Sequence, residues 1–183
     1  MTRVVCAPYV GASDASRPPD TQPMAFASLI PAHLSADMAS ALRDTLNARL
    51  ADAIAVGLQL KQAHWNVRGG TFQQLHELFD TTYAEVVVYG DTIAERIVQL
   101  GGVAHGTVQT VAAATAVAPM SESQLSAAEY VRATVDAMKT FGAAMYRLID
   151  EAGKLGDQVT ADIATEIARG VDKQTWFIGA HLG

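Results

Sequence analysis

Five side chains of the types that bind metal ions lie in one stretch of the chain, between Lys61 and Gly102. They are two histidines and three carboxylates: His64, His76, Asp80, Asp91 and Glu95. Imidazole and carboxylate together suit iron, zinc or manganese, and the lack of thiolate favours hard or borderline metals. The residue types therefore predict a metal site without cysteine ligands.

The spacing of four of these side chains places them on one helix face. His76 and Asp80 are four residues apart, as are Asp91 and Glu95, and at ~100° per residue all four fall within about 100° of arc. Along the axis, Asp80 and Asp91 are separated by roughly 16 Å at ~1.5 Å per residue. One straight helix cannot close both pairs around one ion, but two antiparallel copies related by a two-fold axis can. The spacing therefore predicts two equal metal sites shared between subunits.

A simpler interpretation of the same residues stays open. Carboxylates on a helix commonly form a solvated face, and a lone histidine beside an apolar run is commonly a core residue. The occurrence of four candidate ligands on one arc, with His64 just upstream, weakens this interpretation. Spacing alone does not decide between the two.

Three separated motifs in this stretch have a recognisable order and spacing. They are K-Q-A-H-W-N-V-R-G at Lys61–Gly69, F-x-x-L-H-x-x-F-D at Phe72–Asp80, and D-x-x-A-E-R-x-x-x-L-G-G at Asp91–Gly102. Weaker matches follow at Thr160–Ile163 and Asp172–Phe177. Together they resemble the Dps family, the miniature ferritins first described as DNA-binding proteins from starved cells, over roughly residues 34–182.

The resemblance implies a ferroxidase centre at a dimer interface. It assigns His64, His76 and Asp80 to one subunit and Asp91 and Glu95 to its two-fold mate. Members of the family typically oxidise Fe(II) with hydrogen peroxide, or alternatively dioxygen, and store ferric mineral in a hollow dodecameric shell. We therefore expect iron as the bound metal and a homododecamer built from two-fold dimers. Because histidine binds metal in its neutral form, affinity should fall as pH drops through its titration.

Three further residues are expected close to this centre. Trp65 and Tyr83 carry aromatic rings that can intercept oxidising equivalents, although both can equally be packing residues. Arg96 follows Glu95 directly and is predicted to form a structural ion pair at the subunit interface.

Acidic residues near the start of the last predicted helix are candidates for an iron-entry pore, because acidic residues line three-fold pores in ferritin-like assemblies. The candidates are Asp157, Asp162 and Glu166, of which the last two are four residues apart and share a face. Acidic residues at a helix start also interact favourably with the helix dipole, which is the alternative explanation.

Hydrophobic periodicity predicts four long helices and one short helix. They cover approximately residues 35–67, 71–100, 108–115, 126–152 and 159–178. The second is expected to bury Phe72, Leu75, Phe79, Tyr83, Val86, Val87, Ile93, Ile97 and Leu100. The long connection between the second and third long helices predicts an all-α, ferritin-like four-helix bundle over residues 35–183. Residues 1–34, rich in proline, are predicted to form a flexible N-terminal arm.

Composition favours a cytoplasmic protein with no membrane partner. No run approaches the ~20 apolar residues of a membrane span, and the start of the chain has no convincing secretory segment. Cys6 is the single cysteine, so no intrachain disulfide can form, which fits a reducing compartment.

Charge bears on the main rival function, a nucleoid-associated protein that binds DNA and physically protects it under stress. The net charge is −6, whereas nucleic-acid binders normally carry a basic patch. In the arm, Arg3 and Arg17 are balanced by Asp14 and Asp20. DNA binding is therefore predicted to be weak. A second rival, a ferritin-like shell without activity, is disfavoured by the intact set of candidate ligands.

Overall fold

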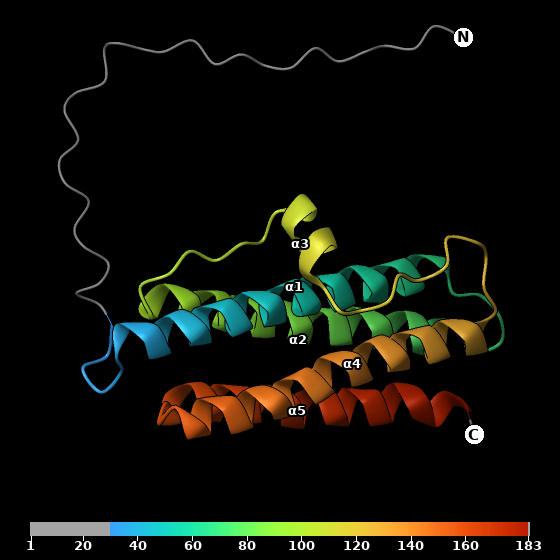
Figure 1. The fold of residues 1–183 in the computed structure, drawn as a ribbon. Helices are drawn as coiled ribbons and strands as arrows, with labels where there is room; N and C mark the ends of the chain where they lie inside the picture. Colours follow the sequence, from blue (N-terminus) through green and yellow to red (C-terminus); the bar gives the residue numbers. More distant parts are fainter. Residues whose placement is uncertain (1–29, 183) are drawn as a thin grey trace, which may run out of the picture.

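The computed structural model describes residues 30–182, and every regular element within them is helical (Figure 1). The elements are α1 (Ala36–Asn66), α2 (Phe72–Gln99), α3 (Val108–Ala114), α4 (Ala127–Lys154), α5 (Gln158–Gly179) and the short 3₁₀ helix η2 (Ala180–Leu182). The predicted helices are confirmed, with ends that agree to within a few residues.

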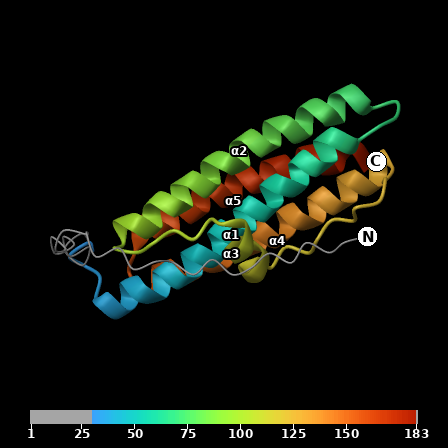
Figure 2. The same ribbon diagram turned by 90° about the horizontal axis from the view of Figure 1, so that it is seen from above.

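The four long helices form a bundle. Helix α1 packs along α2, α4 packs along α5, and contacts of α1 with α4 and of α2 with α5 close the ring. Helix α3 lies against α1 on the outside of the bundle, within the long connection that joins α2 to α4 (Figures 1 and 2). This is the ferritin-like arrangement predicted from the helix pattern.

Capping residues fix where the helices begin. The Ser35 hydroxyl accepts a hydrogen bond from the Met38 amide at the start of α1. Ser126 and Glu129 form a reciprocal capping box at the start of α4. Gly101 follows the C-cap residue Leu100 of α2, and its φ of 77° suits glycine. These local signals set the register in which each helix presents its side chains.

The interior of the bundle contains few polar groups. Among the described residues, the buried polar or charged side chains are Asp52, Thr82, Arg96, Thr134, Asp157, Thr160 and Gln174. None is a histidine or a glutamate. The carboxylate of Asp52 accepts hydrogen bonds from the Thr115 hydroxyl and the Ala116 amide, and so holds the segment after α3 against α1. A metal site built from imidazole therefore has to lie outside the bundle core.

Two expected core residues of α2 are exposed instead. Val87 is 49 % exposed because it lies on the face of α2 that points away from α5 and the core, and Phe72 is 45 % exposed because it begins the helix at the end of the bundle. The prediction that both are buried was wrong for this chain taken alone.

The boundary of the predicted arm can be compared with the structure only in part. Residues 1–29 lie outside the described residues. Leu34, which was assigned to the arm, is buried and packs on the core, so the packed unit includes this residue. None of the helices within residues 30–182 is long and apolar enough to cross a membrane.

Candidate metal centre

His64 at the end of α1 and His76 at the start of α2 are brought together by the short α1–α2 turn. Their rings stack with centroids 3.7 Å apart. The Nδ1 atom of His64 lies 2.7 Å from the carbonyl oxygen of His76, and Nδ1 of His76 lies 2.8 Å from the carbonyl oxygen of His64. A carbonyl only accepts, so each Nδ1 carries the proton and donates. In the neutral rings, both Nε2 atoms are then free to bind a metal, the arrangement typical of histidine ligands.

Asp80 lies one turn after His76 on α2, and its carboxylate is held by a lysine. Lys61 Nζ donates to Asp80 Oδ1 over 2.6 Å. This hydrogen bond lowers the pKa of Asp80 below its ordinary value, outweighing the opposite effect of burial, and the charges of Lys61, His64 and His76 act in the same direction. The first three candidate ligands therefore occupy one end of the bundle, with Asp80 ionised.

Lys61 is the residue near these ligands whose role the sequence did not reveal. It stands three residues before His64 and therefore on the same side of α1, which is the only signal that could have identified it. Its ammonium lies 5.9 Å from the ring centroid of Trp65 and 5.2 Å from that of Tyr83. Both aromatic rings thus lie beside the Lys61–Asp80 pair, and Trp65 is exposed.

The second pair of candidate ligands lies further along α2. Asp91 and Glu95 are both exposed. Within the described part of the chain, no three His, Cys, Asp or Glu side chains are close enough to hold one metal ion. One copy of the chain therefore presents two incomplete sets of ligands, one rich in imidazole and one purely carboxylate.

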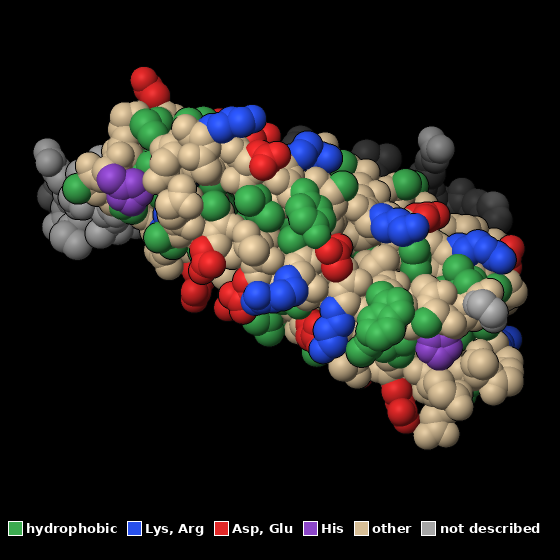
Figure 3. All heavy atoms as spheres, turned by 90° about the horizontal axis from the view of Figure 1, so that it is seen from below, with side chains coloured by type: hydrophobic (Ala, Val, Ile, Leu, Met, Phe, Trp, Pro, Cys, Tyr) green, Lys and Arg blue, Asp and Glu red, His purple; other side chains and the backbone are tan. Residues whose placement is uncertain are grey.

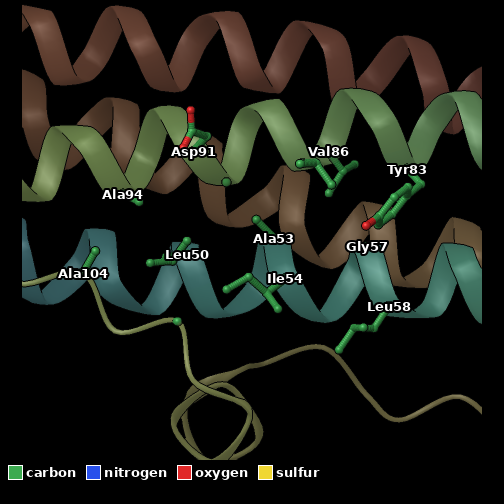
Figure 4. A pocket seen from close by; sticks show the side chains of 13 residues that line it. Leu50, Ala53, Ile54, Gly57, Leu58, Tyr83, Val86, Asp91, Ala94 and Ala104 are labelled. Atoms are coloured by element: carbon green, nitrogen blue, oxygen red, sulfur yellow. The ribbon is translucent and has the colours of Figure 1, made fainter.

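The face of α2 that carries these ligands also exposes apolar side chains. At ~100° per residue, Val87 and Val98 fall within about 20° of Asp80 around the helix, roughly opposite the core side. Beside it, α1 and α2 enclose an apolar groove of about 460 Å³ (Figure 4). Leu50 and Ile54 of α1 line this groove together with Val86 and Asp91 of α2. An exposed apolar surface that adjoins candidate ligands is typical of a contact with another protein.

Arg96 forms an ion pair within its own subunit. Its guanidinium donates to both carboxylate oxygens of Asp157 at 2.9 and 2.8 Å, and its Nε donates to Thr160 Oγ1 at 2.9 Å. The two side chains are only 5 % and 0 % exposed. The prediction of an ion pair is correct, but its placement at the subunit interface was wrong, because Asp157 reaches Arg96 from the start of α5.

The same contacts exclude Asp157 from the candidate pore. Its carboxylate is buried, caps α5 by accepting from the Thr160 amide, and neutralises Arg96. Burial raises the pKa of Asp157, but the hydrogen bonds from Thr160 and Arg96 outweigh it and lower the pKa overall. Asp162 and Glu166, one and two turns into α5, are exposed and stay candidates.

Comparison with known proteins identifies the family. A ferritin-like domain model matches residues 43–183. The DNA protection during starvation protein of Agrobacterium fabrum is 39 % identical over 137 residues, covering 75 % of this chain and 85 % of that protein. DpsC from Streptomyces coelicolor has a TM-score of 0.82 at 30 % identity, covering 90 % of this chain and 96 % of its own. Dps from Microbacterium arborescens, in its high iron form, has a TM-score of 0.77 at 35 % identity, covering 84 % and 98 %. The chain therefore belongs to the Dps family of ferritin-like proteins.

Proposed function

We propose that the protein is a cytoplasmic ferroxidase that oxidises Fe(II), with hydrogen peroxide as the preferred oxidant, and stores the ferric product in a dodecameric shell. The observation that carries the proposal is that the candidate ligands lie in two separate sets, one at the α1–α2 end of the bundle and one further along α2. His64, His76 and Asp80 gather at one end, while Asp91 and Glu95 lie exposed further along the same face. Each set is incomplete, and an antiparallel partner supplies what the other lacks.

The geometry suits iron as the substrate. Two imidazole Nε2 atoms and a carboxylate from one subunit, with two carboxylates from its mate, offer mixed nitrogen and oxygen ligands of the kind that bind Fe(II). The anionic carboxylates stabilise Fe(III) more than Fe(II), because the product carries the higher charge. Each peroxide accepts two electrons from two Fe(II) ions and two protons, its O–O bond breaks, and two waters form. No one-electron step releases a hydroxyl radical.

The exposed apolar surface supports the assembly that this chemistry needs. Leu58, Val87 and Val88 are large apolar side chains left exposed on α1 and α2. Leu58 and Val87 line the same groove as Asp91. Their burial in a two-fold contact would place the ligand pairs of two subunits against each other. In the closed shell, Asp162 and Glu166 would line the route by which Fe(II) enters.

Oxidation and size measurements on the purified protein test the proposal. Anaerobic Fe(II) is added first, then either peroxide or dioxygen, and ferric absorbance is followed. We expect faster oxidation with peroxide, loss of the fast phase in a His64→Ala, His76→Ala variant, and a dodecameric mass by light scattering for both proteins. A monomer at micromolar concentration, or an unchanged rate in the variant, would contradict the shared centre.

Direct DNA binding is the weaker candidate. On the face formed by α4 and α5, Lys and Arg side chains alternate with Asp and Glu and form no continuous basic patch (Figure 3). We propose that any protection of DNA by this protein arises from removing Fe(II) and peroxide, and that association with the nucleoid is secondary.

A further inference from the structure

A buried carboxylate of α1 fastens the segment that follows α3. Asp52 is fully buried, and its Oδ1 accepts hydrogen bonds from Thr115 Oγ1 at 3.0 Å and from the Ala116 amide at 2.7 Å. Its Oδ2 lies 3.1 Å from Arg49 Nε, but within the described residues neither of these two atoms has a hydrogen-bond partner. A buried carboxylate with an unpartnered oxygen contributes little net stability. Its clearest effect is on the position of the segment that it binds.

Helix α3 has few apolar contacts of its own. Among its seven residues only Val111 is buried, and the helix packs chiefly on α1. Polar side chains of α1 bind the chain on either side of it: Asn47 Oδ1 accepts from the His105 amide at 2.9 Å, and Gln59 Nε2 donates to the Ala118 carbonyl over 2.6 Å. A short helix with so little buried apolar surface opens at a lower free energy than the bundle. These polar contacts therefore decide how firmly α3 is held.

Helix α3 also forms one wall of an apolar groove of about 970 Å³. Ile54 and Leu58 of α1 line this groove together with Val108 of α3, which is 73 % exposed. The same Ile54 and Leu58 line the groove between α1 and α2 (Figure 4). The exposed apolar surface is therefore continuous from α2 across α1 to α3. A second copy that covers the α1–α2 groove in the proposed two-fold contact would meet α3 as well.

We propose that Asp52 is a latch for assembly: it holds α3 in the position in which α3 completes the two-fold contact, without touching the partner itself. Because Asp52 is fully buried in its own chain, any effect of this residue on assembly has to pass through α3. Assembly and the closed position of α3 are then linked, and each favours the other by the same factor. The inference rests on the proposed two-fold assembly, but it assigns part of the affinity to a residue outside the contact.

Hydrogen exchange and light scattering over a dilution series of the full chain test the latch. Asp52→Ala removes the acceptor, and Thr115→Val removes one donor from the other side of the same contact. Asp44→Ala and Thr140→Val are the matched controls, because Asp44 is exposed on the same helix and the Thr140 hydroxyl donates within α4. In the dissociated latch variants, amides of residues 107–116 should exchange at least about tenfold faster than in the dissociated parent, with α4 and α5 unchanged. The protein concentration at which half of the assembly dissociates should also rise at least about tenfold.

Exchange in the assembled variants separates a latch from a general loss of stability. Once the latch variants are concentrated enough to assemble, α3 should exchange as slowly as in the assembled parent, because the contact requires α3 in place.

Three results would overturn the proposal. They are an unchanged dissociation concentration in both latch variants, faster exchange throughout the bundle, and α3 exchange that is as fast in the assembled as in the dissociated variants. If Asp52→Ala does not fold, Thr115→Val alone decides between these outcomes. A parent that stays monomeric at micromolar concentration would remove the proposed assembly and the inference with it, so the two failures are distinguishable.

Discussion

Replacing Asp157 with asparagine should destabilise the protein strongly, although the change removes only a charge. Asparagine is as good a helix N-cap as aspartate, so the cap at the start of α5 is retained. The guanidinium of Arg96, only 5 % exposed as a side chain, is instead left without its anion. Removing one partner of a buried pair costs about 3–5 kcal/mol, and we expect about 3 because the amide oxygen still accepts one hydrogen bond.

The loss of stability should be measurable by thermal unfolding. The protein concentration has to be the same for every variant, because assembly makes the midpoint temperature of unfolding depend on concentration. At ~2–4 °C per kcal/mol for a domain of this size, the midpoint should fall by roughly 6–12 °C. Asp162→Asn on the same helix is the matched control. The Asp162 side chain is exposed, so the free energy of unfolding of this variant should stay within about 0.5 kcal/mol of the parent value.

A double substitution separates the uncompensated charge from general damage to packing. Arg96→Met in the Asp157→Asn background removes the buried charge and keeps an unbranched side chain of similar reach, so most of the lost stability should return. If Asp157→Asn cost no more than the Asp162→Asn control, or if the double variant were the least stable of all, the assigned role of the ion pair would be refuted.

Three further predictions concern pH, metal and DNA. The pKa of Asp157 is lower in the folded chain than its ordinary value, so its stabilising contribution is complete above about pH 4 and is lost as the pH falls through the folded pKa. The difference in free energy of unfolding between the parent and Asp157→Asn, measured by chemical denaturation, should therefore narrow in that acid range. A constant difference down to about pH 2 would contradict this. Asp91→Asn with Glu95→Gln should abolish fast Fe(II) oxidation but leave the mass by light scattering unchanged, since amides cannot supply the charge of carboxylate ligands; oxidation at the parent rate would place the chemistry elsewhere. In the proposed dodecamer, twelve copies at −6 would give a net charge of about −72, which would repel duplex phosphates. Supercoiled plasmid should therefore not be retarded at ~0.15 M salt with chelator present, and full retardation at submicromolar protein would restore the nucleoid function to equal standing.

The fold and the candidate ligands could be predicted from sequence because their signals are local. Ser35 and the Ser126–Glu129 capping box begin helices where the pattern indicates, and a four-residue spacing places two ligands on one face whatever the rest of the chain does. These relations depend on the geometry of a single helix.

The remaining features depend on contacts between helices, which spacing does not encode. Asp157 looks like other acidic residues near a helix start until α5 is placed beside α2, where it meets Arg96 over a separation of 61 residues. Lys61 likewise reaches Asp80 across the α1–α2 turn. Val87 was predicted to be buried because its hydrophobicity is visible in the sequence, but no other part of the described chain covers it.

The measurement that tests the shared centre most directly is complementation between two inactive variants. One variant carries His64→Ala and His76→Ala, and the other carries Asp91→Asn and Glu95→Gln. Neither forms an intact centre alone. In a mixed dimer, the histidines of the second variant meet the carboxylates of the first, so one of the two centres is restored.

The two variants would be unfolded, mixed in equal amounts and reassembled, with each variant reassembled alone as a control. Random pairing makes about half of the dimers mixed, so tight Zn²⁺ sites and fast Fe(II) oxidation should return to about one quarter of the parent level. Recovery near that level would establish that the ligands come from two subunits. A mixture as inactive as its two components, although assembled to the same mass, would show that each centre is built within one chain and would contradict the account.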